Sequence, residues 1–259
     1  MPIVNVNDLI EAGVHFGHRV SRWNPKMKPY IFGKRNMIHI INLKETVAGL
    51  IRAYWFLAKI GRREQVLFVG TKRQARRVVR EEAERCGMPY CNERWLGGTL
   101  TNYQTVHSRL ERLADLERIE TSGEIESYTK KMVATVEREK AKILRNLEGV
   151  RTMAKLPGAL VVVDPRREII AVREANKLGI PVVALLDTDS DPELVDIPIP
   201  GNDDAIRAIR LVLHALADAV VEGKVGKVAK EVEGAQAGQT AQAGQVSQAA
   251  PAGGAASSA

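Results

Sequence analysis

The sequence has 259 residues, with 38 Lys or Arg against 31 Asp or Glu and a net charge of +7. This length suits one α/β domain with an insertion and a tail, and the basic balance favours a polyanionic partner, nucleic acid before an anionic membrane. There is no apolar run of about 18 residues and no charged-then-apolar leader, so we expect a soluble cytoplasmic protein. Two cysteines, Cys86 and Cys91, are too few for a disulfide framework.

A basic segment near the N-terminus is the first candidate for a functional site. It carries six cations and no acid between residues 19 and 35, namely Arg19, Arg22, Lys26, Lys28, Lys34 and Arg35. Such a loop repels itself unless phosphates neutralise it, and Trp23 and Tyr30 offer faces on which unpaired bases can stack. We therefore assign RNA binding to these residues together with Asn24. Phe16 and Phe32 are expected to pack on the core instead.

The basic segment is followed by a strand and a helix. The alternation in Ile38–Leu43 predicts a strand. Asn42, with Glu45 three residues later, resembles a capping box and predicts a helix that starts directly after the strand. Trp55 lies on the broad apolar face of that helix, so we expect it in the core rather than on a ligand.

A second strand and helix come next. Val66–Val69 predicts a buried strand, and Thr71 with Gln74 predicts another capping box. The helix behind it is rich in arginine and glutamate, so part of its charge pairs internally. Arg73 and Arg76, in its first turns, have fewer acids nearby and are candidates for phosphate contact.

The stretch RWLGGTLTN at residues 94–102 is open to two interpretations. Gly97 and Gly98 permit backbone angles that let N–H groups approach a phosphate, with Arg94 and Trp95 alongside. The alternative is a tight turn into the following helix. The pattern gives the two interpretations equal weight.

Two helices with apolar residues at steps of three or four are predicted between residues 104 and 155. Their exposed faces carry eleven Lys or Arg and nine Asp or Glu, so much of this charge can pair internally. We expect a helical hairpin that contacts RNA less strongly than the basic segment does.

The clearest unit in the sequence is residues 159–187. Leu160–Val163 and Val182–Leu186 are uninterrupted apolar runs typical of buried parallel strands. The helix between them is expected to start at Asp164 as N-cap with Pro165 in its first position, and to end at Gly179. This is a right-handed βαβ crossover, and its strand ends are where such sheets bind ligands.

The residues after this unit are rich in Asp and Pro and predict an ordered loop, with Asn202 capping a final helix. Carboxylates of this region can converge at the strand ends and hold a hard divalent cation, with a histidine as an additional ligand. The candidates are Asp187, Asp189, Asp203, Asp204 and His18. Capping and turn chemistry is the favoured alternative for these residues.

The sequence lacks the signatures that enzymes of this architecture usually carry. The turn after Val69 reads GTKRQA rather than GxGxxG, and neither a P-loop, a GxSxG nor an HExxH motif is present. Pattern therefore favours an RNA-binding protein that is not an enzyme and requires no cofactor. A sugar-phosphate-binding enzyme of doubly wound fold is the alternative.

Long strings of the sequence resemble the bacterial small-subunit ribosomal protein two family. They are GVHFGHRVSRWNPKMKPYIFGKRNMIHIINL, RWLGGTLTN and VVVDPRREIIAVREANKLGIPVVALLDTDSDPELVDIPIPGNDDAIRAI. The resemblance covers about residues 1–225. It implies a flavodoxin-like three-layer αβα domain with a parallel sheet, built from residues 1–103 and 156–225. It also implies a protruding antiparallel coiled-coil hairpin at 104–155. The tail at 226–259, rich in Ala, Gly and Gln, is outside the family pattern and is expected to be disordered.

The same resemblance implies a function. A member of this family is expected to be a structural constituent of the small ribosomal subunit that joins late and binds the small-subunit ribosomal RNA between head and body. It is further expected to help dock ribosomal protein one, which loads messenger RNA.

Overall fold

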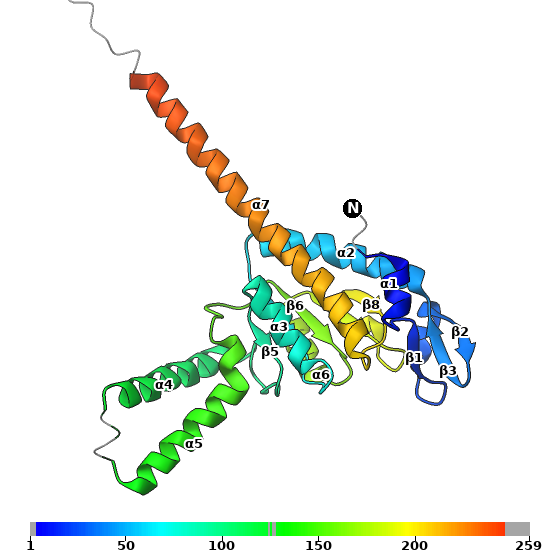
Figure 1. Cartoon of the computed structure of the whole chain (residues 1–259), viewed down its shortest axis with the longest axis horizontal. Helices are drawn as coiled ribbons and strands as arrows, with labels where there is room; N and C mark the ends of the chain where they lie inside the picture. The colour runs from blue at the N-terminus through cyan, green and yellow to red at the C-terminus, as the bar shows by residue number, and fades with distance from the viewer. Residues whose placement is uncertain (1–3, 124, 126–127, 247–259) are drawn as a thin grey trace, which may run out of the picture.

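The computed structural model describes residues 4–123, 125 and 128–246, and its centre is a five-stranded parallel sheet (Figure 1). The strands are β4 (Val66–Val69), β5 (Tyr90–Cys91), β6 (Ala159–Val163), β7 (Val182–Leu186) and β8 (Ile197–Pro200). Their spatial order is β5-β4-β6-β7-β8, and every neighbouring pair is parallel. Counted along the chain this is 2-1-3-4-5, the order of flavodoxin-like doubly wound sheets.

Helices cover both faces of the parallel sheet. α2 (Leu43–Gly61), α3 (Arg76–Cys86) and α7 (Ile206–Val246) pack on the face that carries Val66 and Phe68. α6 (Ile169–Leu178) packs on the opposite face, which carries Leu67 and Val69. Alternate residues of one strand thus enter different cores, because successive side chains of a strand point to opposite faces. The three-layer arrangement expected from the sequence is confirmed.

The basic segment is not a loop. It forms most of a small antiparallel sheet of order β1-β3-β2, with strands β1 (Phe16–Arg19), β2 (Ile31–Arg35) and β3 (Ile38–Ile41). A 3-10 helix, η1 (Pro25–Tyr30), lies between β1 and β2, and a short helix, α1 (Val6–Glu11), precedes β1. The strand predicted at residue 38 therefore exists, but it pairs outside the parallel sheet.

Three aromatic side chains expected in the core are exposed. Phe16 is 47% exposed, Phe32 80% and Trp55 64%. Phe32 points outward because β2 alternates, with Ile31 and Gly33 half-buried on its inner face. Trp55 lies beside the buried stripe of α2, of which Leu50 and Leu57 form part, so the predicted apolar face of that helix is broader than the face that packs.

The predicted helix starts are only partly right. Asn42 caps α2 as expected, since its side chain accepts a hydrogen bond from the N–H of Lys44. The capping box at Thr71 is wrong, because α3 begins at Arg76 without a side-chain cap. Asp164, with φ of 62°, caps a turn by accepting from the N–H of Arg167, and α6 begins only at Ile169.

The Asp- and Pro-rich segment, which was predicted to be a loop, contains a strand. β8 has Pro198 and Pro200 in it, yet it pairs with β7 through Val183↔Ile197 and Leu185↔Ile199. The prolines are tolerated because β8 is the edge strand and needs no donors on its free side. A 3-10 helix, η4 (Pro192–Leu194), precedes it.

The final helix also differs from the prediction. α7 runs to Val246, so residues 226–246 are helical rather than disordered. Alanine and glutamine favour helices, and the first proline after this stretch is Pro251. The part of the predicted tail at 247–259 lies outside the described residues. No helix in the described part of the chain is both long and apolar enough to cross a membrane.

The inserted segment forms α4 (Tyr103–Thr121) and α5 (Lys130–Leu147), which project from the domain side by side (Figure 1), followed by a 3-10 turn, η3 (Glu148–Val150). Both predicted helices are therefore present, while coiled-coil packing stays a prediction. Ion pairs join the two helices and the turn after them, and they are Arg112–Glu139, Lys140–Glu120 and Arg151–Glu117. Charged side chains of the hairpin therefore pair with one another, as expected from its composition.

Candidate nucleic-acid interface

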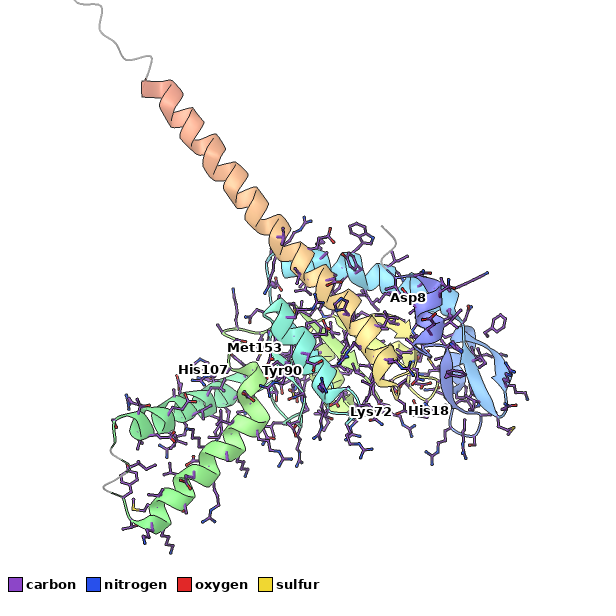
Figure 2. The ribbon with its side chains drawn as sticks, viewed as in Figure 1. Asp8, His18, Lys72, Tyr90, His107 and Met153 are labelled. Carbon is purple, nitrogen blue, oxygen red and sulfur yellow. The ribbon has the colours of Figure 1, made fainter. Side chains whose placement is uncertain are left out.

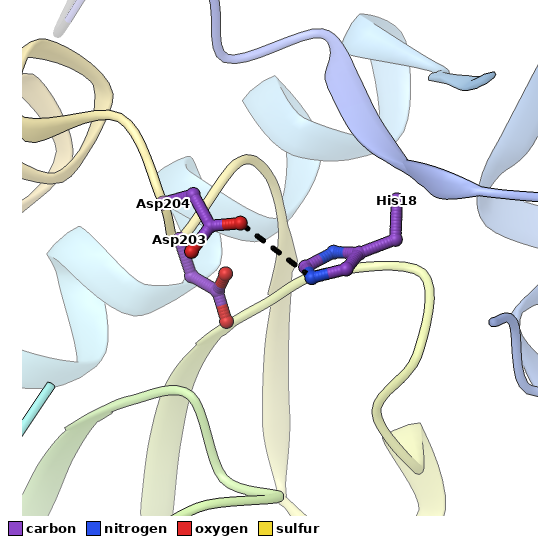
Figure 3. A group of neighbouring side chains, drawn as sticks. All are labelled: His18, Asp203 and Asp204. Carbon is purple, nitrogen blue, oxygen red and sulfur yellow. Dashed lines mark ion pairs between the residues drawn. The ribbon is translucent and has the colours of Figure 1, made fainter.

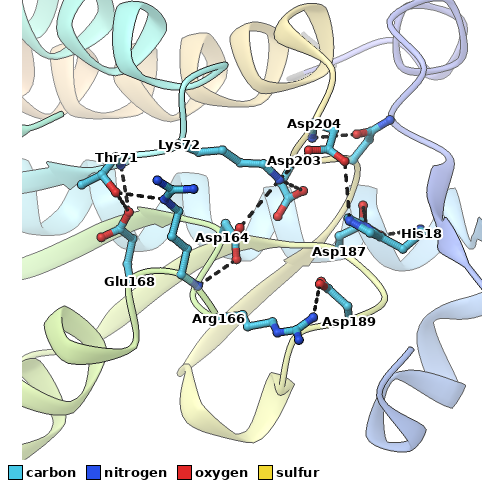
Figure 4. Close-up of polar contacts among 12 residues, drawn as sticks. His18, Thr71, Lys72, Asp164, Arg166, Glu168, Asp187, Asp189, Asp203 and Asp204 are labelled. Carbon is cyan, nitrogen blue, oxygen red and sulfur yellow. Dashed lines mark hydrogen bonds and ion pairs between the residues drawn. The ribbon is translucent and has the colours of Figure 1, made fainter. Parts of the chain in front are cut away.

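Charged side chains gather at the carboxyl end of the parallel sheet, where the loops after β4, β6, β7 and β8 meet the first strand of the small sheet (Figure 4). Figure 2 shows Lys72 and His18 at this end of the domain and His107 on the projecting hairpin. The gathered residues are His18, Thr71, Lys72, Asp164, Arg166, Glu168, Asp187, Asp189, Asp203 and Asp204. Doubly wound sheets bind their ligands at this edge.

Lys72 is the cation at the centre of this group. Its Nζ lies 2.7 Å from an oxygen of Asp203, 2.7 Å from one of Asp204 and 3.7 Å from one of Asp164. Burial and the carboxylates of Asp164 and Asp187 raise the pKa of Asp203 to about 7, and Lys72 opposes that rise. Burial lowers the pKa of Lys72, but the carboxylates of Asp203, Asp204 and Asp164 outweigh that effect and raise the pKa above its ordinary value. No local sequence pattern indicates this role of Lys72.

His18 is a second internal cation. Its Nδ1 lies 2.8 Å from Asp187 and its Nε2 3.5 Å from Asp204. The hydrogen bond to Asp187, against the effect of burial, raises the pKa of His18 to about 9, so the imidazole is charged at neutral pH. Gly17 permits this approach, because a Cβ there would lie 2.7 Å from the methyl group of Thr188.

The predicted cation ligands come together only in part. His18, Asp203 and Asp204 offer ligand atoms within 4.8 Å of one another (Figure 3). Asp187 is instead directed at His18, and Asp189 pairs with Arg166 at 2.6 Å. Of the five predicted ligands, the structure thus groups three, and the metal site stays a prediction.

Thr71 and Glu168 form a separate buried contact. Glu168 accepts hydrogen bonds from the backbone N–H and the hydroxyl of Thr71. Burial raises the pKa of Glu168, and the hydrogen bonds from Thr71 oppose the rise. Arg167 donates from Nε to the Thr71 hydroxyl at 3.2 Å. This long-range contact explains why Thr71 does not cap α3.

The turn at residues 97–98 is occupied by a carboxylate of the protein itself. Glu174 accepts hydrogen bonds from the Trp95 indole and from the backbone N–H groups of Gly98, Leu100 and Thr101. Burial alone would raise the pKa of Glu174, but these donors hold it below its ordinary value. Glu174 of α6 thus occupies the donors of Trp95 and Gly98, whereas Gly97 is exposed, and RNA contact by these three residues stays a prediction. The tight-turn interpretation is favoured.

The candidate arginines around α3 have different environments. Arg76 donates to the Thr71 carbonyl and pairs with Glu93 at 3.0 Å, so part of its charge is neutralised. Arg73 and Arg94 are exposed, and neither has an ion-pair partner among the described residues. Both keep their charge available to an external anion.

Within the basic segment, two residues serve the fold. Lys26 lies 2.9 Å from Asp191 and also pairs with Glu193. Asn24 caps η1, and its backbone N–H donates to the Thr188 carbonyl at 2.8 Å. These contacts attach the small sheet to the loop after β7, with acids that lie about 165 residues away in the sequence.

The remaining cations of the basic segment face solvent. They are Arg19, Arg22, Lys28, Lys34 and Arg35, each exposed and none ion-paired within the described ranges. Beside them, His18, Arg22, Trp23, Arg166 and Asp189 line a hollow of about 660 Å³. Trp23 is 36% exposed and its ring centroid lies 5.3 Å from that of His39. Tyr30 is half-buried and packs on the core, which leaves less of its ring for a base.

The fold and this edge define a basic, doubly wound α/β protein whose inner charges pair with one another and whose outer cations remain free. The chain belongs to the ribosomal protein S2 family, whose family model matches residues 9–223. The resemblance found in the sequence is thus confirmed. The family consists of ribosomal proteins rather than enzymes, so the alternative of a sugar-phosphate-binding enzyme is wrong. The protein is a component of the ribosome.

Curated relatives cover nearly the whole chain. The chain is 54% identical over 233 residues to the small ribosomal subunit protein uS2 of Rhodopirellula baltica, covering 90% of both chains. It is 55% identical over 225 residues to uS2 of Syntrophobacter fumaroxidans, covering 86% of this chain and 82% of the relative. To the small ribosomal subunit protein uS2c of Rhodomonas salina it is 53% identical over 237 residues, covering 91% and 98%.

Proposed function

We propose that this protein is a structural constituent of the small subunit of the cytoplasmic ribosome and binds small-subunit ribosomal RNA between head and body. The observation that carries RNA binding is the set of five exposed cations of the basic segment that have no ion-pair partner in the described residues, Arg19, Arg22, Lys28, Lys34 and Arg35. The carboxyl end of the parallel sheet behind them is neutralised internally, so these five cations supply free positive charge beside it. Family membership supports the small-subunit role.

The contacts expected here are with backbone phosphate and with an unpaired base. Exposed Lys and Arg neutralise phosphates and release condensed counterions. Trp23 is partly exposed and lines its hollow, where a base can stack on the ring. The hairpin ranks second, because many of its charges already pair with one another.

Equilibrium binding to a small-subunit ribosomal RNA fragment tests this function. The affinity should fall with salt at a logarithmic slope of about 0.7 to 0.9 per phosphate contacted. Binding that is absent, or that does not depend on salt, would contradict the proposal.

An apolar hollow supports the docking of ribosomal protein one. It has a volume of about 330 Å³ and is lined by Ile10, His15, Phe32, Ile40, Ile41 and Leu43, with Asn42 and Lys44 at its side. Phe32 is 80% exposed, an unusual position for a phenylalanine unless a partner covers it. We propose that an apolar segment of ribosomal protein one occupies this hollow.

The docking proposal predicts a selective loss of that partner. Phe32→Ala should weaken binding of purified ribosomal protein one at least tenfold, whereas Trp55→Ala, a matched exposed aromatic on α2, should not. Retention of full affinity in Phe32→Ala would exclude this hollow as the docking surface.

A structural divalent cation at His18, Asp203 and Asp204 stays a prediction. The cluster contains the nitrogen and oxygen ligands such an ion needs, and the second oxygen of Asp203 is buried without a partner. Lys72, however, already neutralises both carboxylates. Metal analysis of dialysed protein, with Asp204→Asn as control, decides it: stoichiometric metal lost in the variant supports the site, and metal-free wild type removes it.

A further inference from the structure

A second basic hollow lies where the base of the hairpin meets the αβα domain. It has a volume of about 640 Å³ and is bounded on the domain side by Arg76, Glu93, Arg94 and Arg167. The facing wall is α5, which contributes Lys142 and Arg145. We call this hollow the hairpin cleft. Both walls are charged with the same sign, although they belong to different parts of the fold.

The hairpin cleft has an excess of positive charge. Its lining holds five cations and one carboxylate, Glu93, which both Arg76 and Arg145 approach at 3.0 and 3.6 Å. Arg94 and Lys142 are exposed, and in the described part of the chain neither has an acid within ion-pair distance. The carboxylate of Glu168 is only 3% exposed, and it accepts a hydrogen bond from the backbone N–H of Thr71. The cleft therefore lacks the anion that would balance it.

Two cationic groups of the cleft are held in position before any ligand arrives. The Nε of Arg76 donates to the Thr71 carbonyl at 3.1 Å, and the Nε of Arg167 donates to the Thr71 hydroxyl at 3.2 Å. Both arginines line the hollow. Arginine forks with fixed geometry suit phosphate oxygens, and little side-chain freedom is given up on binding.

We propose that the hairpin cleft binds backbone phosphates of RNA and thereby bridges the hairpin to the αβα domain. This inference rests on the proposed RNA binding and adds a second contact site to it. The lining contains no aromatic ring, so it suits the sugar-phosphate backbone rather than a base. Neighbouring residues Arg166 and Arg167 line the Trp23 hollow and the hairpin cleft respectively. One RNA passing along this edge of the sheet can therefore reach both sites, which a small phosphorylated molecule cannot do.

The test compares two double variants of the full chain that remove the same charge. Arg94→Gln with Lys142→Gln removes two of the cleft cations that have no ion-pair partner among the described residues. Arg52→Gln with Lys59→Gln removes two exposed cations from α2, outside the cleft and outside the hairpin. The cleft variant should reduce the salt slope of RNA binding by about two units, one for each phosphate that is no longer neutralised. The control should keep the wild-type slope. None of the four substituted side chains has an ion-pair partner among the described residues, so both variants should show wild-type circular dichroism and melting.

Three outcomes would overturn the inference in distinguishable ways. If wild type and the cleft variant bind RNA with equal slopes, the cleft assignment fails and the proposed function stands. If wild type does not bind RNA at all, both fail. A third arm titrates inorganic pyrophosphate without RNA: saturable binding that is abolished only in the cleft variant, with RNA slopes unchanged, assigns the cleft to a free phosphorylated ligand.

Discussion

Replacing Arg19, Arg22 and Lys28 with Ala should flatten the salt dependence of RNA binding by about two to three logarithmic units, since each of these cations is expected to neutralise one phosphate. All three side chains are exposed and make no ion pair in the part of the chain that the structure describes. Lys26→Ala is the internal control. Its ammonium already pairs with Asp191 and Glu193, so the single variant should change the slope less than any one of the three.

Trp23→Ala separates stacking from charge. It should weaken RNA binding by about 1 to 3 kcal/mol with an unchanged slope, because stacking a base releases no ions. Trp55→Ala, on the outer face of α2, should change neither quantity. If removing the hairpin weakens binding more than the triple variant does, the ranking of the two RNA-binding surfaces is reversed.

Lys72→Met should lower the free energy of unfolding by about 3 to 5 kcal/mol at pH 8, since it leaves the buried Asp203 carboxylate without its cation. The loss should be smaller at pH 5. The pKa of Asp203 is already raised to about 7, and without Lys72 it rises further, so the carboxyl is neutral in the folded variant at pH 5. A group with a raised acidic pKa costs the fold stability as pH rises from about 4 through that pKa.

Urea unfolding at the two pH values, in the presence of a chelator, measures this difference. His18 has a dependence of the same sign in a higher pH window: because its pKa is raised to about 9, its charged form stabilises the fold fully below about pH 6.5, and this stabilisation disappears as pH rises through 9. This contribution is common to wild type and variant and largely cancels in their difference. Lys26→Met, with its cation on the surface, should leave stability nearly unchanged. Equal losses for Lys72→Met at pH 5 and pH 8 would show that Asp203 does not titrate as described.

Sequence patterns predicted the strands best where the local pattern matches the burial of the strand in the folded protein. Val66–Val69, Leu160–Val163 and Val182–Leu186 are unbroken apolar runs, and all three are buried parallel strands. β8 was missed because Pro198 and Pro200 normally argue against a strand, and only its position at the sheet edge makes them acceptable. In the small sheet, β3 was predicted, whereas β1 and β2 were missed because the cations in and around them resemble a solvated loop.

The site was harder to predict because its contacts join distant parts of the chain. Lys72 and Asp203 are 131 residues apart, and Glu174 and Gly98 are 76 apart. No local pattern reports such pairs. Composition therefore identified the cations of the basic segment but not which of them the protein neutralises itself. The same limit applies to Trp95, which was expected beside a phosphate-binding turn and is buried, with its indole N–H donating to Glu174.

Protein–RNA crosslinking on assembled small subunits tests most directly whether this edge of the domain holds the ribosomal RNA. We expect crosslinks from the Arg19–Arg35 segment and from the hairpin cleft to RNA of both head and body, and few from the outer face of α2. Crosslinks confined to α2 and the hairpin tip, with none from Arg19–Arg35, would contradict it.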